Sequence, residues 1–277
     1  MIFDAHQHFW QFDPVRDSWM REAVMDTIRR DFLPTDLQPI LQQNGIDGCV
    51  AVQADQSEME TNFLLDLAAK NDWIKGVVGW IDLKSPSVES RLAYYQQFPK
   101  LKGFRHILQG EKPDFMLGLN FIRGVHLLKK YNFTYDILVF PKHLKVLKLF
   151  FQYFDNQPFV IDHIAKPYIK KGLIKEWERD IRQIAKRHPN VHCKISGIVT
   201  EADWKNWKAE DFTPYLDVIF EAFGADRIMY GSDWPVCLLA ADYEKQLSIV
   251  KNYCQKLSDT EGSKIMGDNA ARFYILT

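Results

Sequence analysis

Two histidines near the amino terminus, His6 and His8, are separated by one residue at the end of an apolar run that favours a β-strand. Side chains alternate along a strand, so residues two apart point to the same face and both imidazoles face the same way. Two neutral imidazoles side by side can hold a transition metal or hydrogen-bond the oxygens of a substrate. Taken alone, the pair is explained equally well as two structural histidines.

Two further apolar runs end in polar pairs, one in Asp162-His163 and the other in Ser232-Asp233. In a parallel barrel, the active site is assembled where the carboxyl ends of the strands meet. Polar residues at the ends of three different strands therefore favour function over structure. We interpret four residues as one functional cluster: His6, His8, His163 and Asp233.

Cationic residues end two more of the predicted strands, the fourth in Arg105-His106 and the seventh in Lys194. Alternation directs Arg105 and His106 to opposite faces, although the loop that follows could bring both to one site. A guanidinium can bind a carboxylate or paired hydroxyls through two hydrogen bonds, so we predict that Arg105 contacts substrate. Lys194 is a second candidate, explained equally well as a paired or snorkelling lysine.

Aromatic residues stand beside these strand ends, namely Trp10, Trp80 and Trp234. Their flat faces suit the C–H surface of a sugar ring, although core packing explains any single tryptophan as well. Gln53 ends the second predicted strand and offers hydrogen bonds to a polyol. We predict that these four residues contribute to substrate binding.

Eight short β-branched or apolar runs alternate with helical stretches, which is typical of βα units and a parallel sheet. The predicted strands cover 2–6, 47–53, 75–82, 101–108, 133–140, 158–163, 190–196 and 227–232. Eight units of this kind close a (β/α)8 TIM barrel, so we predict an α/β fold with one domain over 1–277. The segment 9–34 is too long for a simple connection, and we place it over the barrel mouth. Segment 197–211 is a second candidate rim loop.

Composition limits the function classes. Hydrophobic residues make up 47% of the chain, and 35 basic against 36 acidic residues give a formal charge of −1 without a long basic block, so we expect no nucleic-acid partner. The four cysteines form no C-x-x-C pair, which argues against a disulfide framework or a zinc knuckle. With no leader pattern or membrane-length apolar run, we expect a cytoplasmic protein that acts on a small molecule. The sequence does not predict the oligomeric state.

The chain resembles the amidohydrolase superfamily, and the resemblance rests on motifs at the predicted strand ends. These motifs are Asp4-Ala5-His6-Gln7-His8-Phe9-Trp10, Gly103-Phe104-Arg105-His106, Asp162-His163-Ile164-Ala165-Lys166-Pro167 and Tyr230-Gly231-Ser232-Asp233-Trp234-Pro235. They are most similar to the lactonase branch, which includes enzymes acting on L-fucono- and L-rhamnonolactones and on 2-pyrone-4,6-dicarboxylate. The similarity extends to the closing run Gly267–Tyr274. The resemblance implies a hydrolase that opens a cyclic ester.

The resemblance also implies roles. Asp233 becomes the base that activates water. We hypothesise that His6, His8 and His163, or an ion they hold, stabilise the oxyanion that forms on the lactone carbonyl, and that either His106 or His163 then protonates the leaving alkoxide. Arg105 holds the substrate.

Metal content follows from a departure from the wider superfamily. Metal-rich members place a carboxylated lysine or a glutamate at the end of strand four or five, where this chain has Arg105-His106 and Phe140-Pro141. We therefore expect at most one divalent ion, with zinc preferred, and metal-free catalysis stays open. The expected ligands are His6, His8, His163 and Asp233.

The expected substrate is the lactone of a deoxy sugar acid, of the L-fuconolactone or L-rhamnonolactone type. A dicarboxylate substrate would favour a cluster of arginines, whereas Arg105 and Lys194 are the only cations at the predicted strand ends. One alternative is a metal-dependent decarboxylase of the same superfamily, which would release carbon dioxide. Another is a non-catalytic sugar-binding barrel, which the cost of burying Asp233 among three histidines without chemistry disfavours.

Overall fold

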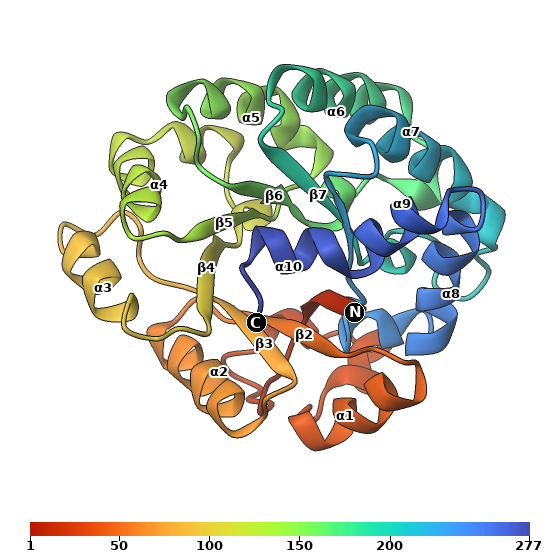
Figure 1. The fold of residues 1–277 in the computed structure, drawn as a ribbon, viewed down its shortest axis with the longest axis horizontal. Coiled ribbons are helices and arrows are strands. Elements are labelled where there is room, and N and C mark those ends of the chain that lie inside the picture. Colours follow the sequence, from red (N-terminus) through yellow and green to blue (C-terminus); the bar gives the residue numbers. More distant parts are fainter.

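The computed structural model describes all residues 1–277 and forms a closed barrel of eight parallel strands in the order β1 to β8 (Figure 1). The strands are β1 Phe3–Gln7, β2 Gly48–Val52, β3 Ile74–Gly79, β4 Leu101–His106, β5 Thr134–Ile137, β6 Phe159–Ile161, β7 Val191–Ile195 and β8 Ile228–Tyr230. The predicted (β/α)8 fold in a single domain is confirmed.

One or more helices follow each strand, and they form a ring around the barrel except for the last, Asn269–Phe273, which crosses the end of the barrel near the two termini (Figure 1). They are α1 Pro34–Gln43, α2 Glu58–Lys70, α3 Val88–Tyr95, α4 Leu119–Lys130, α5 Leu144–Phe150, α6 Lys175–Arg187, α7 Thr213–Phe223, α8 Tyr243–Cys254, α9 Asp259–Ser263 and α10 Asn269–Phe273. Local sequence explains their starts: the Ser57 hydroxyl accepts the Glu60 amide at 3.2 Å before α2, and Pro214 stands in the first turn of α7. None of the helices combines the length and apolarity needed to cross a bilayer.

Backbone hydrogen bonds between the end of the first strand and the turn that follows the last strand close the ring. The amide of His8 donates to the carbonyl of Trp234 at 2.7 Å, and the amide of Asp233 donates to the carbonyl of His6 at 2.8 Å. The seam of the barrel is therefore built from the same residues that the sequence singles out for chemistry.

Strands β6 and β8 end two residues earlier than the predicted 158–163 and 227–232. The reason is backbone geometry, because His163 (φ 54°) and Asp233 (φ 59°) adopt the left-handed conformation, which a strand cannot continue. Each of these side chains consequently projects from a turn and not from a pleated strand.

The segment between β1 and α1 forms an excursion over the carboxyl end of the barrel. Trp10 and Phe32 exchange two backbone hydrogen bonds of 3.0 and 2.9 Å, which hold the ends of the excursion together. Between them lie two short 3₁₀ turns, Ser18–Met20 and Ala23–Ile28. Trp10, Trp19 and Met25 from this segment line the cavity described below.

Candidate active site

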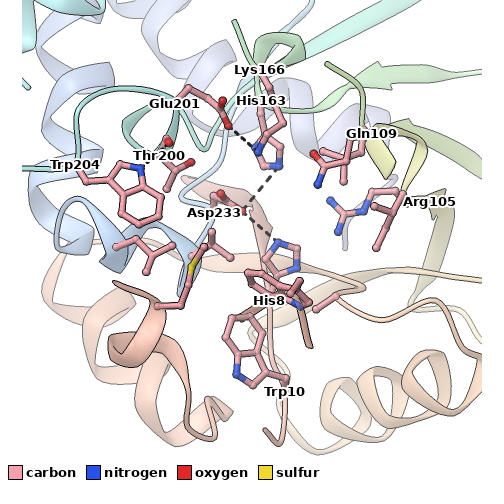
Figure 2. A pocket seen from close by; sticks show the side chains of 17 residues that line it. His8, Trp10, Arg105, Gln109, His163, Lys166, Thr200, Glu201, Trp204 and Asp233 are labelled. Atoms are coloured by element: carbon pink, nitrogen blue, oxygen red, sulfur yellow. Dashed lines mark hydrogen bonds and ion pairs between the residues drawn. The ribbon is translucent and has the colours of Figure 1, made fainter. Parts of the chain in front are cut away.

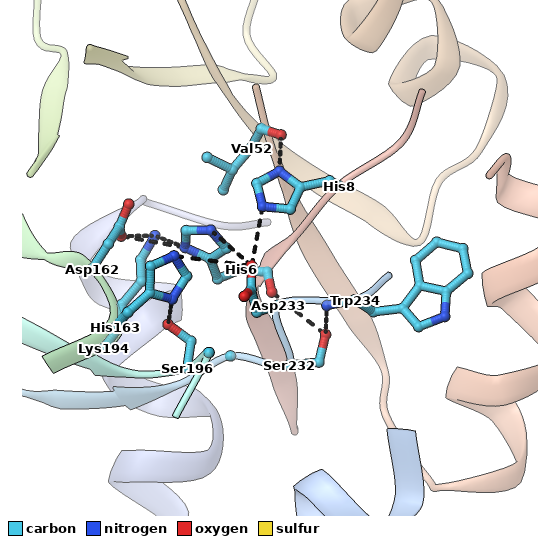
Figure 3. Close-up of polar contacts among 12 residues, drawn as sticks. His6, His8, Val52, Asp162, His163, Lys194, Ser196, Ser232, Asp233 and Trp234 are labelled. Atoms are coloured by element: carbon cyan, nitrogen blue, oxygen red, sulfur yellow. Dashed lines mark hydrogen bonds and ion pairs between the residues drawn. The ribbon is translucent and has the colours of Figure 1, made fainter. Parts of the chain in front are cut away.

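Asp233 lies at the centre of a cluster of three imidazoles (Figure 3). Its Oδ1 is 3.2 Å from Nε2 of His8 and 3.9 Å from Nε2 of both His6 and His163. All four side chains are buried. Burial acts to raise the pKa of Asp233, but the adjacent His163 and His8 outweigh it, and the pKa falls below its ordinary value. The group is a carboxylate at neutral pH.

The His8 ring is oriented by a backbone carbonyl. Its Nδ1 lies 2.7 Å from the carbonyl oxygen of Val52, and because a carbonyl only accepts, Nδ1 carries a proton and donates. In the neutral ring, Nε2 then presents a lone pair to the Asp233 carboxylate at 3.2 Å. Two acceptors facing each other at this distance need a proton or a metal cation between them, so the pair fits a cation site.

His163 starts a run of four consecutive residues with positive φ, His163 to Lys166, closed by a 2.7 Å bond from the Lys166 amide to the His163 carbonyl. Left-handed backbone costs roughly 1–2 kcal/mol per non-glycine residue, so this turn is held by its surroundings. The His163 Nδ1 lies 2.9 Å from the Ser196 hydroxyl. Burial is the main cause that lowers the pKa of His163 well below its usual value, which keeps the ring neutral.

Gly197 provides the space that these two side chains need. It has φ 56°, and a Cβ placed there would lie 2.6 Å from His163 Nδ1 and 2.8 Å from Asp233 Oδ2. Only glycine combines this backbone conformation with so close an approach.

Beneath His6 lies a fully buried network of charged groups in the barrel interior. Lys194 Nζ is 2.6 Å from Asp136 Oδ2, 3.1 Å from Asp162 Oδ1 and 3.2 Å from His6 Nδ1. Arg105 Nη1 lies 3.1 Å from the other Asp162 oxygen and 3.2 Å from His6 Nε2. Two cations and two carboxylates thus balance one another, which offsets the cost of burying charge.

The pKa values of the two carboxyl groups in this network shift in opposite directions. Burial raises the pKa of Asp136 to about 6 against the opposing effect of Lys194. Burial also acts to raise the pKa of Asp162, but Lys194, His6 and Arg105 together reverse the direction and lower it well below its ordinary value. Asp162 is therefore the charged partner that holds both cations in place.

A cavity of about 350 Å³ opens above the cluster (Figure 2). Its lining contains the polar residues His8, Arg105, Gln109, His163, Lys166, Thr200, Glu201 and Asp233, and the apolar residues Trp10, Trp19, Met25, Ala54, Ile107, Leu138, Trp204, Val236 and Leu239. The polar groups gather around Asp233, while tryptophans stand at the sides. This is the size and character of a site for one small polar molecule with an apolar edge.

The structure brings five of the predicted residues to this cavity: His8, Trp10, Arg105, His163 and Asp233. His6 lies directly below them, within the same cluster. Two overlapping groups of side chains could hold a metal ion, His6 with His8 and Asp233, and His6 with Asp162 and His163.

Three residues expected to contact substrate lie outside the lining. Gln53 is buried and donates to the Arg105 backbone carbonyl at 3.1 Å, so its side chain supports the arginine. Lys194 is locked below His6 by its carboxylates. Trp234 is 1% exposed and packs edge-on against Phe9 and Phe32. The expectation that they face substrate is corrected by these positions.

His106 and Trp80 are also outside the lining. Trp80 Nε1 lies 3.4 Å from His106 Nδ1, and His106 Nε2 lies 3.2 Å from Glu111. The His106 ring stacks on Phe115, on the side of β4 that faces away from the Arg105 cluster, as strict alternation along the strand requires. This arrangement gives His106 no access to a leaving group in the cavity.

Sequence reasoning missed several residues of the site. Lys166 lies within the motif 162–167, but the direction of its side chain depends on the left-handed turn. Glu201 and Trp204 come from the 197–211 segment, which was identified only as a rim loop. Asp136 carries no local signal, because it sits in the middle of β5 with the burial pattern of an apolar residue.

Comparison with known proteins finds similar chains that match over nearly the full length. The model of the family described as Amidohydrolase matches residues 3–276. A protein from Burkholderia multivorans named L-fucono-1,5-lactonase is 39% identical over 99% of this chain and 95% of its own, and one of the same name from Burkholderia ambifaria is 36% identical over 98% and 94%. A solved amidohydrolase from Burkholderia multivorans with bound zinc covers both chains fully at 39% identity and a TM-score of 0.95.

Proposed function

Since the chain belongs to the amidohydrolase family, we propose that it is a lactonase that hydrolyses the lactone of a sugar acid, with L-fucono-1,5-lactone as the first candidate substrate. The observation that carries the proposal is the full-length identity of 39% with a protein of that name. The cavity above Asp233 supplies the chemistry that the reaction needs.

The charges of the cavity support a neutral substrate. Its two permanent cations are already paired, Arg105 with Asp162 at 3.1 Å and Lys166 with Glu201 at 2.8 Å. A doubly anionic ligand would have to compete with both carboxylates. A neutral polyol ring instead meets hydrogen-bonding groups on one side and the faces of tryptophans on another.

The proposed base is Asp233. Its lowered pKa keeps it ionised, and it lies within the cavity, so it can take a proton from a water that attacks the lactone carbonyl. His163 and His8 flank the carboxylate from two other strand ends and orient the attack. Arg105, with one edge in the cavity, is placed to hold the carbonyl oxygen or a neighbouring hydroxyl.

A single divalent ion, with zinc preferred, fits the same cluster. The observation that favours it is the 3.2 Å approach of His8 Nε2 to the Asp233 carboxylate while Nδ1 of the same ring donates to Val52, and His6 and His163 are the other expected ligands. When bound, such an ion polarises a carbonyl and lowers the pKa of water. The lumen cations Lys194 and Arg105 already neutralise Asp162, which argues against a second ion in the group that contains it.

The decisive experiment is a panel of aldonolactones, a pyrone dicarboxylate and a carboxylated phenol, assayed for acid release in weak buffer and for carbon dioxide release. We expect acid release with a clear preference in kcat/KM for a deoxy sugar lactone. The panel is run with and without chelator to determine whether an ion is required. Preference for the dicarboxylate, or carbon dioxide release without acid, would overturn the proposal.

A further inference from the structure

Opening a lactone creates an alkoxide that needs a proton, and the residues discussed so far leave this need unmet. Asp233 is ionised and takes a proton. His163 is held by Ser196 and faces Asp233, while His106 lies outside the cavity. The cavity lining therefore has to supply a proton donor that no other role uses.

Lys166 is such a donor. It is the fourth residue of the left-handed turn that begins at His163. In a tight turn closed by an i to i+3 bond, side chains three apart lie above one another, so His163 and Lys166 project the same way. Both line the cavity, as Figure 2 shows. The strained turn thus delivers two polar groups to one site.

Glu201 fixes the position of the Lys166 ammonium. The two side chains lie 2.8 Å apart, and each is only 14% exposed. A partly buried ion pair has a substantial desolvation cost, and this one stands in the wall of a reaction cavity. An ammonium has three N–H donors, of which the contact with Glu201 occupies one, so the others remain to be offered to a ligand.

We propose that Lys166 is the general acid of the reaction, with Glu201 as its positioning residue; this inference rests on the proposed lactonase function. As the carbonyl carbon to ring oxygen bond breaks, the departing oxygen takes a proton from Lys166 Nζ. The water that attacked has by then given one proton to Asp233 and kept the other in the new carboxyl group. Asp233 returns its proton to Lys166 through solvent, and the carboxyl group releases the second proton, so each turnover yields one hydroxy acid anion and one proton.

The experiment compares wild type with Lys166→Ala, Lys166→Arg and Glu201→Gln on the lactone that wild type opens fastest. The matched control is Lys170→Ala, because Lys170 pairs with Asp203 at 3.4 Å and joins the same two loops outside the cavity lining. Circular dichroism checks that each variant is folded. Ethylammonium is then added to Lys166→Ala as a replacement acid, with tetramethylammonium, which has no proton to donate, as the salt control.

We expect Lys166→Ala to lower kcat by about 10²–10⁴ with little change in KM, as for the loss of a positioned acid. Ethylammonium should raise the kcat of Lys166→Ala about tenfold, and tetramethylammonium should leave it unchanged. Lys166→Arg should stay slow because guanidinium barely gives up its proton, whereas Lys170→Ala should match wild type. The kcat of Glu201→Gln should lie between that of Lys166→Ala and that of wild type.

Four results would overturn the assignment: normal kcat in Lys166→Ala, a loss confined to KM, full activity in Lys166→Arg, or a kcat loss that ethylammonium does not repair better than tetramethylammonium. If wild type opens no lactone at all, the proposed function fails instead. The two failures are therefore distinguishable.

Discussion

Replacing Gly197 by alanine should disable the site while leaving the barrel folded. The new Cβ would lie 2.6 Å from His163 Nδ1, against about 3.4 Å for an ordinary contact, so the ring has to retreat by the difference, 3.4 − 2.6 = 0.8 Å. The carboxylate of Asp233, 2.8 Å from the same Cβ, has to give way as well. Because misplacement by about 1 Å can cost about a hundredfold in rate, we expect kcat/KM to fall by about that factor.

The positive φ of Gly197 has its own effect on stability, and a second glycine isolates it. Gly172 has φ 63°, and nothing lies within 4 Å of its added Cβ. Alanine at Gly172 should lower the free energy of unfolding by roughly 1–2 kcal/mol, a loss of a few degrees in Tm, and alanine at Gly197 should lower it further because the clash adds to the same backbone cost. The assay is lactone hydrolysis beside thermal unfolding of both variants. Unchanged kcat/KM in Gly197→Ala, or an equal activity loss in Gly172→Ala, would refute the steric argument.

Other predictions concern the same cluster. Asp233→Asn should keep the circular dichroism spectrum of the wild type but lose about a hundredfold or more in turnover, and near-normal turnover would remove Asp233 from the mechanism. The pH profile should lack an acid limb near neutrality: the pKa of Asp233 is lowered, so its carboxylate is lost only as pH falls below its ordinary range, and burial lowers the pKa of His6 and His163, so both rings stay neutral. Because the pKa of Asp136 in the buried network is raised to about 6, we expect kcat/KM to stay level from about pH 8 down to about pH 7, and a midpoint at or above 7 would contradict this assignment. Elemental analysis should find at most one tightly held ion per chain, lost in His8→Ala, whereas two ions would show that Lys194 and Arg105 do not block a second position.

Strand positions were predictable from sequence because the strands are apolar runs and most of them have a polar end. That pattern was sufficient to identify His6, His8, His163 and Asp233, which the structure brings together. Alternation also directed Arg105 and His106 to opposite faces, as observed. We also expected that the next loop could bring His106 to the same site as Arg105, but the His106 ring packs on Phe115 outside the cavity.

Residues beyond the strand ends were harder to predict, since their directions depend on backbone conformation. The left-handed turn that directs Lys166 into the cavity contains no glycine, so the sequence gives no sign of it. Trp234 follows Asp233 directly, yet it turns away from the cavity and packs beside Phe9. Buried ion pairs such as Asp136 with Lys194 were equally hidden, because their partners are 58 residues apart in the chain.

The candidate site is complete only when the first and last strands of the barrel are paired. His6 and His8 lie at the end of β1, Asp233 lies in the turn that follows β8, and the backbone hydrogen bonds around them join the two edges of the sheet. The cluster is therefore incomplete until β8 is in place, and a local opening between β1 and β8 would separate the Asp233 carboxylate from His6 and His8. Turnover would therefore report whether the ring of strands is closed. A permuted chain with new ends at the exposed turn around Gly172 would connect the two halves of the site by a covalent link.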